Sequence, residues 1–410
     1  MERLQQCKKY VDWFEPLHTI ASEQTGLSDF GADKSYQTGL RVILEALDDY
    51  CDLNELGLYA APLRLVQNLK QRLVAEQAFK NDPAILEQRI EKPLLITGIV
   101  RTGSTALHYL MARDPNRQHL EYWLADNPMP RPSRDEWADH PNFVSTKASL
   151  EMMYETSPKL KAIHFLDAEW PGECGQLLSQ TFTDDYWPGV RSTPYYNQWY
   201  EHCDMVPTYT QHKRLLQWIG SNEPDKPWLL KYPVHMRHLK SFLRVYPDAR
   251  VIWTHRDPAS IMSSYASMIE VLRGLSVRPE TIDRNEIQRE LMEIWAPGVE
   301  RAMVVRAQYP EAQFYDLHFD DFVAEVRAEN EDRISIQLRS LEQHLESQKQ
   351  KLEQTRVGHI NADRSSLAKA TEGRIRKLED KVKQRRRKLT GQKEISWHSE
   401  QIMAALILIE

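Results

Sequence analysis

The stretch LLITGIVRTGST at residues 94–105 decides the fold of this 410-residue chain. An apolar run leads to Gly98, a short turn ends at Gly103, and a helical pattern follows. This order is typical of phosphate-binding loops, in which backbone N–H groups and the helix dipole converge on an anion. The spacing also fits the nucleoside-triphosphatase loop G-x-x-x-x-G-K-[ST], except that Ser104 stands in place of the lysine. The sequence therefore predicts a phosphate-binding loop whose one cationic side chain is Arg101.

The composition permits a large core and argues against some classes of protein. The chain is 41% hydrophobic and has a formal net charge of −6, so a nucleic-acid binder is not expected. Its four cysteines match no metal-ligand spacing. No apolar run is long enough to span a membrane, and the first residues are not a cationic and apolar leader. We therefore expect a cytoplasmic protein.

Changes in pattern divide the chain into three predicted parts. Residues 1–90 carry helical apolar stripes, residues 91–325 alternate apolar strands with helical patterns, and residues 326–410 are highly charged. The alternation predicts a P-loop-like, three-layer α/β fold with a parallel sheet, because parallel strands need crossover connections. The predicted strands are Leu94–Ile99, Trp228–Lys231, Arg250–Thr254 and Gln313–Phe319. Such a sheet binds ligands at the carboxyl ends of its strands, where the loop at residues 99–103 would lie.

The last part, residues 326–410, is predicted to form a charged helical tail. Apolar residues recur with heptad spacing in two short segments, with a break around Gly358 and Gly373, which favours a helical hairpin or an interrupted coiled coil. Residues 374–388 hold nine Lys or Arg against two acidic residues, a pattern that we interpret as a solvated helix face. The apolar end at 403–409 would need a surface to bury it. The tail is therefore a candidate for self-association or for binding a protein partner.

A second informative block covers two later predicted strands and the helix after them. The first strand ends at Lys231, with His235 four residues on, and the second ends near Arg256, with Ser264 eight residues on. Asp257-Pro258 is predicted to begin the next helix, with the aspartate as N-cap. An arginine and a serine hydroxyl at these positions suit a phosphate monoester, because the guanidinium gives bidentate hydrogen bonds and the hydroxyl adds a donor.

Together, the loop ITGIVRTGST and the block from Lys231 to Ser264 resemble the sulfotransferases that use 3′-phosphoadenosine-5′-phosphosulfate (PAPS). The loop is most similar to that of the bacterial branch, R-[ST]-G-[ST]-T. The motifs DPNR at 114–117, NPMPRP at 127–132 and AEWPGEC at 168–174 also fit that branch. The resemblance covers about residues 90–322. It implies an enzyme that moves a sulfuryl group from PAPS, its co-substrate, to a hydroxyl of a small-molecule or lipid acceptor, without a metal.

The resemblance also implies how the donor would be held. By the family's pattern, the 5′-phosphosulfate would be bound by the loop residues Arg101, Thr102, Gly103, Ser104 and Thr105. The 3′-phosphate would be bound by Arg256 and Ser264. Arg101 and Lys231 would neutralise the charge that develops on the bridging oxygen during sulfuryl transfer.

Two residues compete for the role of catalytic base. His235 resembles the family's histidine that takes the proton of the acceptor hydroxyl, although it could instead cap the helix that follows Pro233. Glu173 is the rival, since some branches of the family use a carboxylate, although it could instead form a structural ion pair with an arginine. Both residues stay candidates on the sequence alone.

The tail departs from the family's pattern. The family normally continues past Asp321 with a segment that closes over donor and acceptor, and here the heptad pattern stands in its place. Two alternatives therefore stay open. The chain could be a P-loop nucleotide-dependent phosphotransferase, which would need Mg²⁺ and which the missing loop lysine disfavours. It could also be a catalytically weakened interaction protein with a sulfotransferase fold. Asp316, Asp320 and Asp321 resemble an acidic strand end that could bind a metal, and the family pattern makes them structural instead.

Overall fold

The computed structural model describes residues 2–49 and 52–393, and the apolar end at 403–409 lies outside them. The chain divides into two compact units, Met1–His318 and Phe319–Glu410. The three parts predicted from the sequence stay a prediction. No helix in the described part of the chain is long and apolar enough to cross a membrane.

The first unit is built on a parallel five-stranded sheet with the order β2-β3-β1-β4-β5. Its strands are β1 (Leu94–Gly98), β2 (Gln118–His119), β3 (Trp228–Lys231), β4 (Arg250–His255) and β5 (Phe314–His318). The central strands are buried, which is why they read as continuous apolar runs in the sequence. Leu95 of β1 lies in register with both Leu230 of β3 and Val251 of β4. The four predicted strands are confirmed to within one residue at each end, and only the two-residue β2 was missed.

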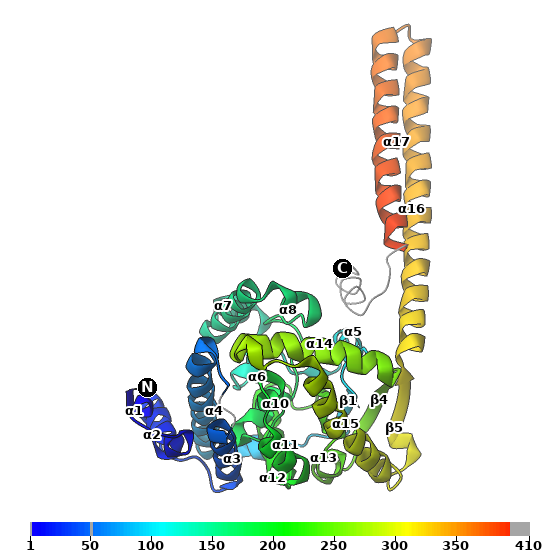
Figure 1. Cartoon of the computed structure of the whole chain (residues 1–410). Helices are drawn as coiled ribbons and strands as arrows, with labels where there is room; N and C mark the ends of the chain where they lie inside the picture. The colour runs from blue at the N-terminus through cyan, green and yellow to red at the C-terminus, as the bar shows by residue number, and fades with distance from the viewer. Residues whose placement is uncertain (1, 50–51, 394–410) are drawn as a thin grey trace. The chain divides into compact units, whose positions relative to one another are not determined.

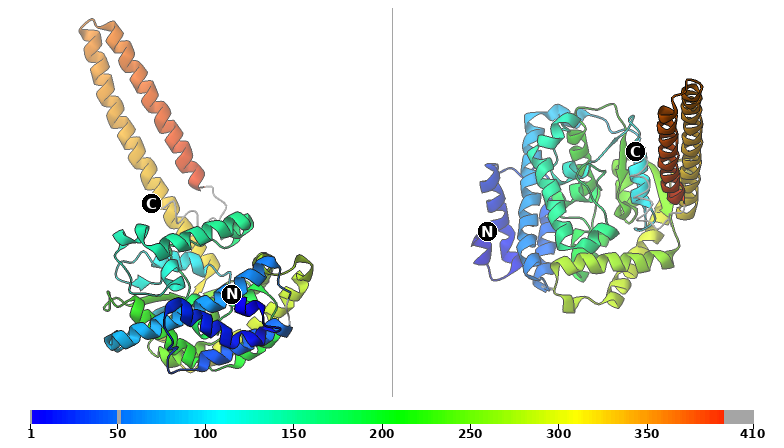
Figure 2. Two further views of the ribbon diagram at one scale, coloured as in Figure 1. Left: turned by 90° about the vertical axis from the view of Figure 1, so that its left-hand side faces the viewer. Right: turned by 90° about the horizontal axis from the view of Figure 1, so that it is seen from above.

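Helices lie on both sides of this sheet, as Figures 1 and 2 show, so the predicted α/β fold is confirmed. Helix α5 (Ser104–Met111) follows β1 and packs on β1 and β3. Helix α14 (Pro258–Ser276) follows β4 and packs against α15 (Arg284–Arg306). The other α-helices after β1 in this unit are α6 (Tyr122–Asp126), α7 (Pro141–Thr156), α8 (Pro158–Ile163), α9 (Gly175–Leu178), α10 (Tyr186–Val190), α11 (Pro194–His202), α12 (Val206–Ile219) and α13 (Leu239–Val245).

The N-terminal part of this unit is helical, as predicted. Its α-helices are α1 (Glu2–Gln5), α2 (Phe14–Thr25), α3 (Ser35–Asp49) and α4 (Glu55–Asn81). Helix α4 packs against α2 on one side and α14 on another, so it joins the N-terminal helices to the rest of the unit. Short 3₁₀ helices are η1 (Tyr10–Trp13), η2 (Pro83–Glu87), η3 (Arg134–Asp139), η4 (Ser179–Thr181), η5 (Pro233–Met236), η6 (Pro279–Thr281) and η7 (Glu311–Gln313).

The second unit is a hairpin of two long helices, α16 (Phe319–Asn361) and α17 (Ser365–Lys393), which lie side by side in Figures 1 and 2. The predicted helical tail is confirmed, and coiled-coil packing stays a prediction. The predicted break between the two heptad segments, around Gly358 and Gly373, is confirmed as the turn of this hairpin at residues 362–364. Both glycines themselves lie inside helices, where glycine costs only about 1 kcal/mol. In the turn Asp363 has a φ of 57°, a conformation that aspartate tolerates.

Asp316 on β5 is a structural carboxylate. Arg306 donates two hydrogen bonds to it, from Nη1 to Oδ1 at 2.7 Å and from Nη2 to Oδ2 at 2.6 Å, and His255 Nε2 lies 2.6 Å from Oδ1. The hydrogen bonds from Arg306 lower the pKa of the Asp316 carboxyl to about 2. The carboxylate therefore ties β5 to β4 and to the end of α15.

We expect Asp316→Asn to lower the free energy of unfolding by about 1 kcal/mol near neutral pH, because a bidentate but partly exposed pair is lost. The folded-state pKa lies below the ordinary value of 3.8. The stabilisation is therefore present above that value and is lost as the pH falls towards about 2. Urea unfolding followed by tryptophan fluorescence at about pH 7 and about pH 3 measures both effects. The exposed Asp225→Asn is the control, and an equal loss in both variants would contradict the assignment.

Candidate functional site

The turn after β1 depends on a close approach of two strands. Gly98 has a φ of 148°, and a Cβ atom placed there would lie 2.4 Å from the carbonyl oxygen of Thr254 on β4. Only glycine fits such a backbone and such a contact. Gly103 has a φ of 80° and is the residue immediately before α5. The two glycines of the motif therefore let the chain leave the sheet and enter the helix within five residues.

Internal hydrogen bonds fix the conformation of the loop. The buried Thr102 hydroxyl donates to the carbonyl oxygen of Ile99 at 2.8 Å and lies 2.6 Å from the hydroxyl of Thr254. Ser104 and Thr105 are the first two residues of α5. The N–H groups in the first turn of a helix have no partner within the helix, and the positive end of its dipole lies there. The loop therefore has the conformation in which the first N–H groups of a helix can face an anion, and anion binding by the loop stays a prediction.

The two sequence blocks meet at Arg101. Its Nε donates to the hydroxyl of Ser264 at 3.0 Å, and its Nη1 donates to the carbonyl oxygen of Ile163 at 3.0 Å. Arg256 Nη1 donates to the carbonyl oxygen of Arg101 at 3.1 Å. Asp257 is the N-cap of α14 as predicted, with its carboxylate accepting from the N–H of residue 260. Two guanidinium groups and a serine hydroxyl from distant parts of the sequence thus lie together beside the loop.

Lys231 and Glu173 form an ion pair at the end of β3. The Lys231 side chain is only 3% exposed, and its Nζ also donates to the Thr105 hydroxyl at 3.2 Å. The Glu173 side chain is 26% exposed. The next residue, Cys174, donates its N–H to the carbonyl oxygen of Lys231 at 3.1 Å. A buried cation and a partly exposed carboxylate therefore lie next to the first turn of α5.

His235 has a different environment. It lies in η5 and is fully buried, with Nδ1 2.9 Å from the hydroxyl of Tyr209. Its ring also packs against Phe242 and Tyr232. Burial holds the pKa of His235 well below the ordinary value, so the imidazole is neutral. The structure gives this histidine no exposed surface, in contrast to Glu173.

His164 is a further residue of this region, and the sequence analysis missed it. It directly follows α8, and the carbonyl oxygen of the residue before it, Ile163, accepts a hydrogen bond from Arg101. Burial lowers its pKa, and the charges of Glu173, Lys231 and Arg101 also act on it. No spacing or motif in the sequence around residue 164 points to this site, because only the tertiary fold brings α8 to the loop.

Comparison with known proteins agrees with this geometry. Residues 93–332, more than half of the chain, match the sulfotransferase family. The chain belongs to the sulfotransferase family. This confirms the resemblance seen in the sequence, and the match continues into the start of α16. Among curated proteins, none matches the chain.

Two solved structures of mycobacterial sulfotransferases are similar to this one. Sulfotransferase STF1 from Mycobacterium tuberculosis H37Rv is 35% identical, with a TM-score of 0.70 over 76% of this chain and 85% of that chain. Sulfotransferase STF9 from Mycobacterium avium is 26% identical, with a TM-score of 0.69 over 80% of this chain and 82% of that chain. The parallel sheet and its helices are therefore the fold of known sulfotransferases.

We expect Gly98→Ala to lower the free energy of unfolding by more than about 3 kcal/mol, because the methyl group would collide with the backbone of Thr254 at a φ that alanine rarely adopts. Gly274→Ala is the matched control. Gly274 lies inside α14 with no atom near the added Cβ, so alanine there should be neutral or stabilise by up to about 1 kcal/mol. Chemical denaturation of both variants measures the difference. A Gly98→Ala protein as stable as the control would contradict the strand approach.

Proposed function

We propose that this sulfotransferase moves a sulfuryl group from PAPS to a hydroxyl group of a small-molecule or lipid acceptor. The observation that carries the proposal is the meeting of Arg256 and Ser264 with Arg101 beside the loop. PAPS has a phosphosulfate at one end of its ribose and a separate phosphate on the 3′ oxygen. A donor of this kind needs two neighbouring anion-binding groups, and the loop and the Arg256–Ser264 pair supply them.

The loop residues 101–105 would hold the 5′-phosphosulfate through the N–H groups at the start of α5. Arg256 and Ser264 would hold the 3′-phosphate. The Ser264 hydroxyl accepts its hydrogen bond from Arg101, so its own proton stays available for a phosphate oxygen. PAPS supplies the sulfuryl group when bound and leaves as adenosine 3′,5′-bisphosphate.

We assign the role of base to Glu173. Its carboxylate is partly exposed and lies beside Lys231 and the start of α5, whereas His235 is enclosed by aromatic rings. Glu173 takes the proton of the acceptor hydroxyl as the oxygen–sulfur bond forms and the bond from sulfur to the 5′-phosphate oxygen breaks. Lys231 neutralises the charge that develops on the departing oxygen. Arg101, held at its φ of 68° by the loop, adds a second positive charge.

Experiments can distinguish this proposal from the two alternatives, a phosphotransferase and a catalytically weakened interaction protein. A phosphotransferase would need a cation for a γ-phosphate where this chain has Ser104. A weakened interaction protein would keep the nucleotide site and lack turnover. The same assays separate them, since Mg²⁺-dependent hydrolysis of ATP would favour the first, and nucleotide binding without transfer to any hydroxyl acceptor would favour the second.

Calorimetry should detect binding of adenosine 3′,5′-bisphosphate to the full chain. We expect Arg101→Ala and Arg256→Ala each to weaken it by about 10- to 100-fold, because each removes charge-assisted hydrogen bonds to a phosphate. The exposed Arg89→Ala is the control and should bind as the wild type does. The absence of binding at millimolar nucleotide, or equal loss in all three variants, would contradict the donor site.

Glu173→Gln should lower kcat by about 10²- to 10⁴-fold while bisphosphate binding stays within about twofold, because the amide keeps the shape of the side chain and cannot accept the proton. Glu169→Gln is the matched control. It lies four residues earlier, pairs with Arg134 and is exposed, so its kcat should be unchanged. Transfer of radiolabelled sulfate to a panel of alcohols measures both variants. Full turnover in Glu173→Gln would return the role of base to His235.

A further inference from the structure

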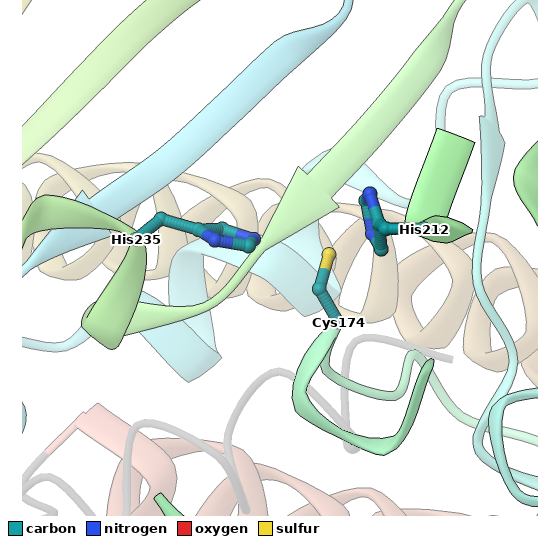
Figure 3. Close-up of side chains that lie close together, drawn as sticks. All are labelled: Cys174, His212 and His235. Atoms are coloured by element: carbon teal, nitrogen blue, oxygen red, sulfur yellow. The ribbon is translucent and has the colours of Figure 1, made fainter. Parts of the chain in front are cut away.

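Three side chains that can bind metals meet in the interior of the first unit. Cys174 comes from the residue before α9, His212 from α12 and His235 from η5. All three are buried, and their potential ligand atoms all lie within 4.8 Å of one another. Figure 3 shows the Cys174 sulfur pointing between the two imidazole rings. This is the one group of three such residues within the described ranges 2–49 and 52–393.

Two tyrosines hold the histidines in a defined orientation. His212 Nδ1 lies 2.8 Å from the hydroxyl of Tyr246, and His235 Nδ1 lies 2.9 Å from the hydroxyl of Tyr209. When Nδ1 donates its proton to the tyrosine oxygen, the Nε2 atom carries the lone pair. Metal-binding histidines are commonly held this way. One ring nitrogen donates a hydrogen bond to a neighbouring group, and the other carries the lone pair that binds the metal.

His212 Nε2 and His235 Nε2 are buried and have no hydrogen-bond partner among the residues that the structure describes. Buried polar atoms of this kind are uncommon, and each asks for an explanation. The thiol of Cys174 cannot be the hydrogen-bond partner of both nitrogens, because one S–H group can donate to only one of them. A single ion coordinated by one sulfur and two nitrogens would satisfy all three side chains.

We propose that Cys174, His212 and His235 bind one thiophilic d¹⁰ metal ion, Zn²⁺ or Cu⁺. A thiolate and imidazole nitrogens are ligands that both ions accept. On binding, the sulfur–metal bond replaces the S–H bond, and the thiol proton is released to solvent.

The ion would brace the segment that carries the proposed base. Cys174 directly follows Glu173, and its N–H holds the carbonyl of Lys231. His235 lies four residues beyond that lysine. One ion would therefore tie α12, the end of β3 and the Glu173 segment together from inside the protein. The bonding of the ion does not depend on the donor or the acceptor, so this inference stands apart from the proposed function.

Metal analysis of the full, tag-free chain tests the site. Mass spectrometry of the purified protein, followed by titration of the metal-stripped protein, should give about one equivalent of Zn²⁺ or Cu⁺. Competition against a chromophoric zinc chelator and against bathocuproine tells the two ions apart. X-ray absorption should show one sulfur at about 2.3 Å and two nitrogens at about 2.0 Å for zinc. The melting temperature should rise when the ion is restored.

Matched variants separate this cluster from other thiols and histidines. Cys174→Ser and His212→Gln should lose the bound ion, and circular dichroism reports whether each variant folds. Cys203→Ser and His238→Gln are the controls and should keep it. Cys203 is partly buried, and His238 is a buried histidine outside the cluster whose Nε2 also has no partner among the described residues.

Two results would overturn the proposal, and neither depends on catalysis. One is a wild-type protein that takes up neither ion in either competition, a result that stands even if the variants fail to fold. The other is full retention of the ion in folded Cys174→Ser and His212→Gln. Failure of bisphosphate binding in a protein that holds the ion would count against the proposed function alone.

Discussion

The positive charge of Lys231 sits at the buried end of β3, and the arrangement of the site follows from the need to pair it. A cation that is almost fully enclosed is stable only with an opposite charge and hydrogen-bond acceptors around it. Glu173 and the Thr105 hydroxyl meet that need, so the segment before α9 and the first turn of α5 are both held at the end of the same strand. The ion pair that stabilises the buried charge also places the Glu173 carboxylate next to the loop after β1.

In the proposed function, the loop and the Arg256–Ser264 pair would together hold a nucleotide that carries two separate anionic groups. Central strands β1 and β4 end side by side, and an arginine follows each of them, Arg101 after β1 and Arg256 after β4. Their close approach at Gly98 leaves no room for a side chain, so the two turns lie against each other. The hydrogen bond from Arg256 to the backbone of Arg101 then fixes their spacing. A lysine in the loop would place positive charge where a γ-phosphate binds. In this chain the additional positive charge is that of Arg256, in the turn after β4, and so lies at a different position.

Much of this could be predicted from local patterns in the sequence. The strands are continuous apolar runs, and the loop has its glycines at fixed spacing. Asp257 is the N-cap of α14, and the next residue, Pro258, is the first residue of that helix. What depends on tertiary packing could not be predicted. The cluster of Cys174, His212 and His235 has no recognisable spacing, because its members come from three separate elements. The environment of His164 and the enclosure of His235 likewise follow from the packing of elements around them. In the tail, the break between the two heptad segments indicated the hairpin, whereas the glycines beside it lie within the helices, because an exposed helix tolerates glycine at small cost.

The long sequence separations within the site have a consequence for how the protein is made. Lys231 and Glu173 are 58 residues apart, Lys231 and Thr105 are 126 apart, and Arg101 is 155 residues from Arg256 and 163 from Ser264. Contacts between residues so far apart in the sequence form slowly, because the entropic cost of closing a long loop must be met before the contact stabilises the chain. A chain emerging from the ribosome has its phosphate loop early, yet it cannot complete the pocket until α14 has been synthesised. During that interval the apolar strand β1 has no β4 beside it, so the nascent first unit exposes apolar surface and an unpaired strand edge.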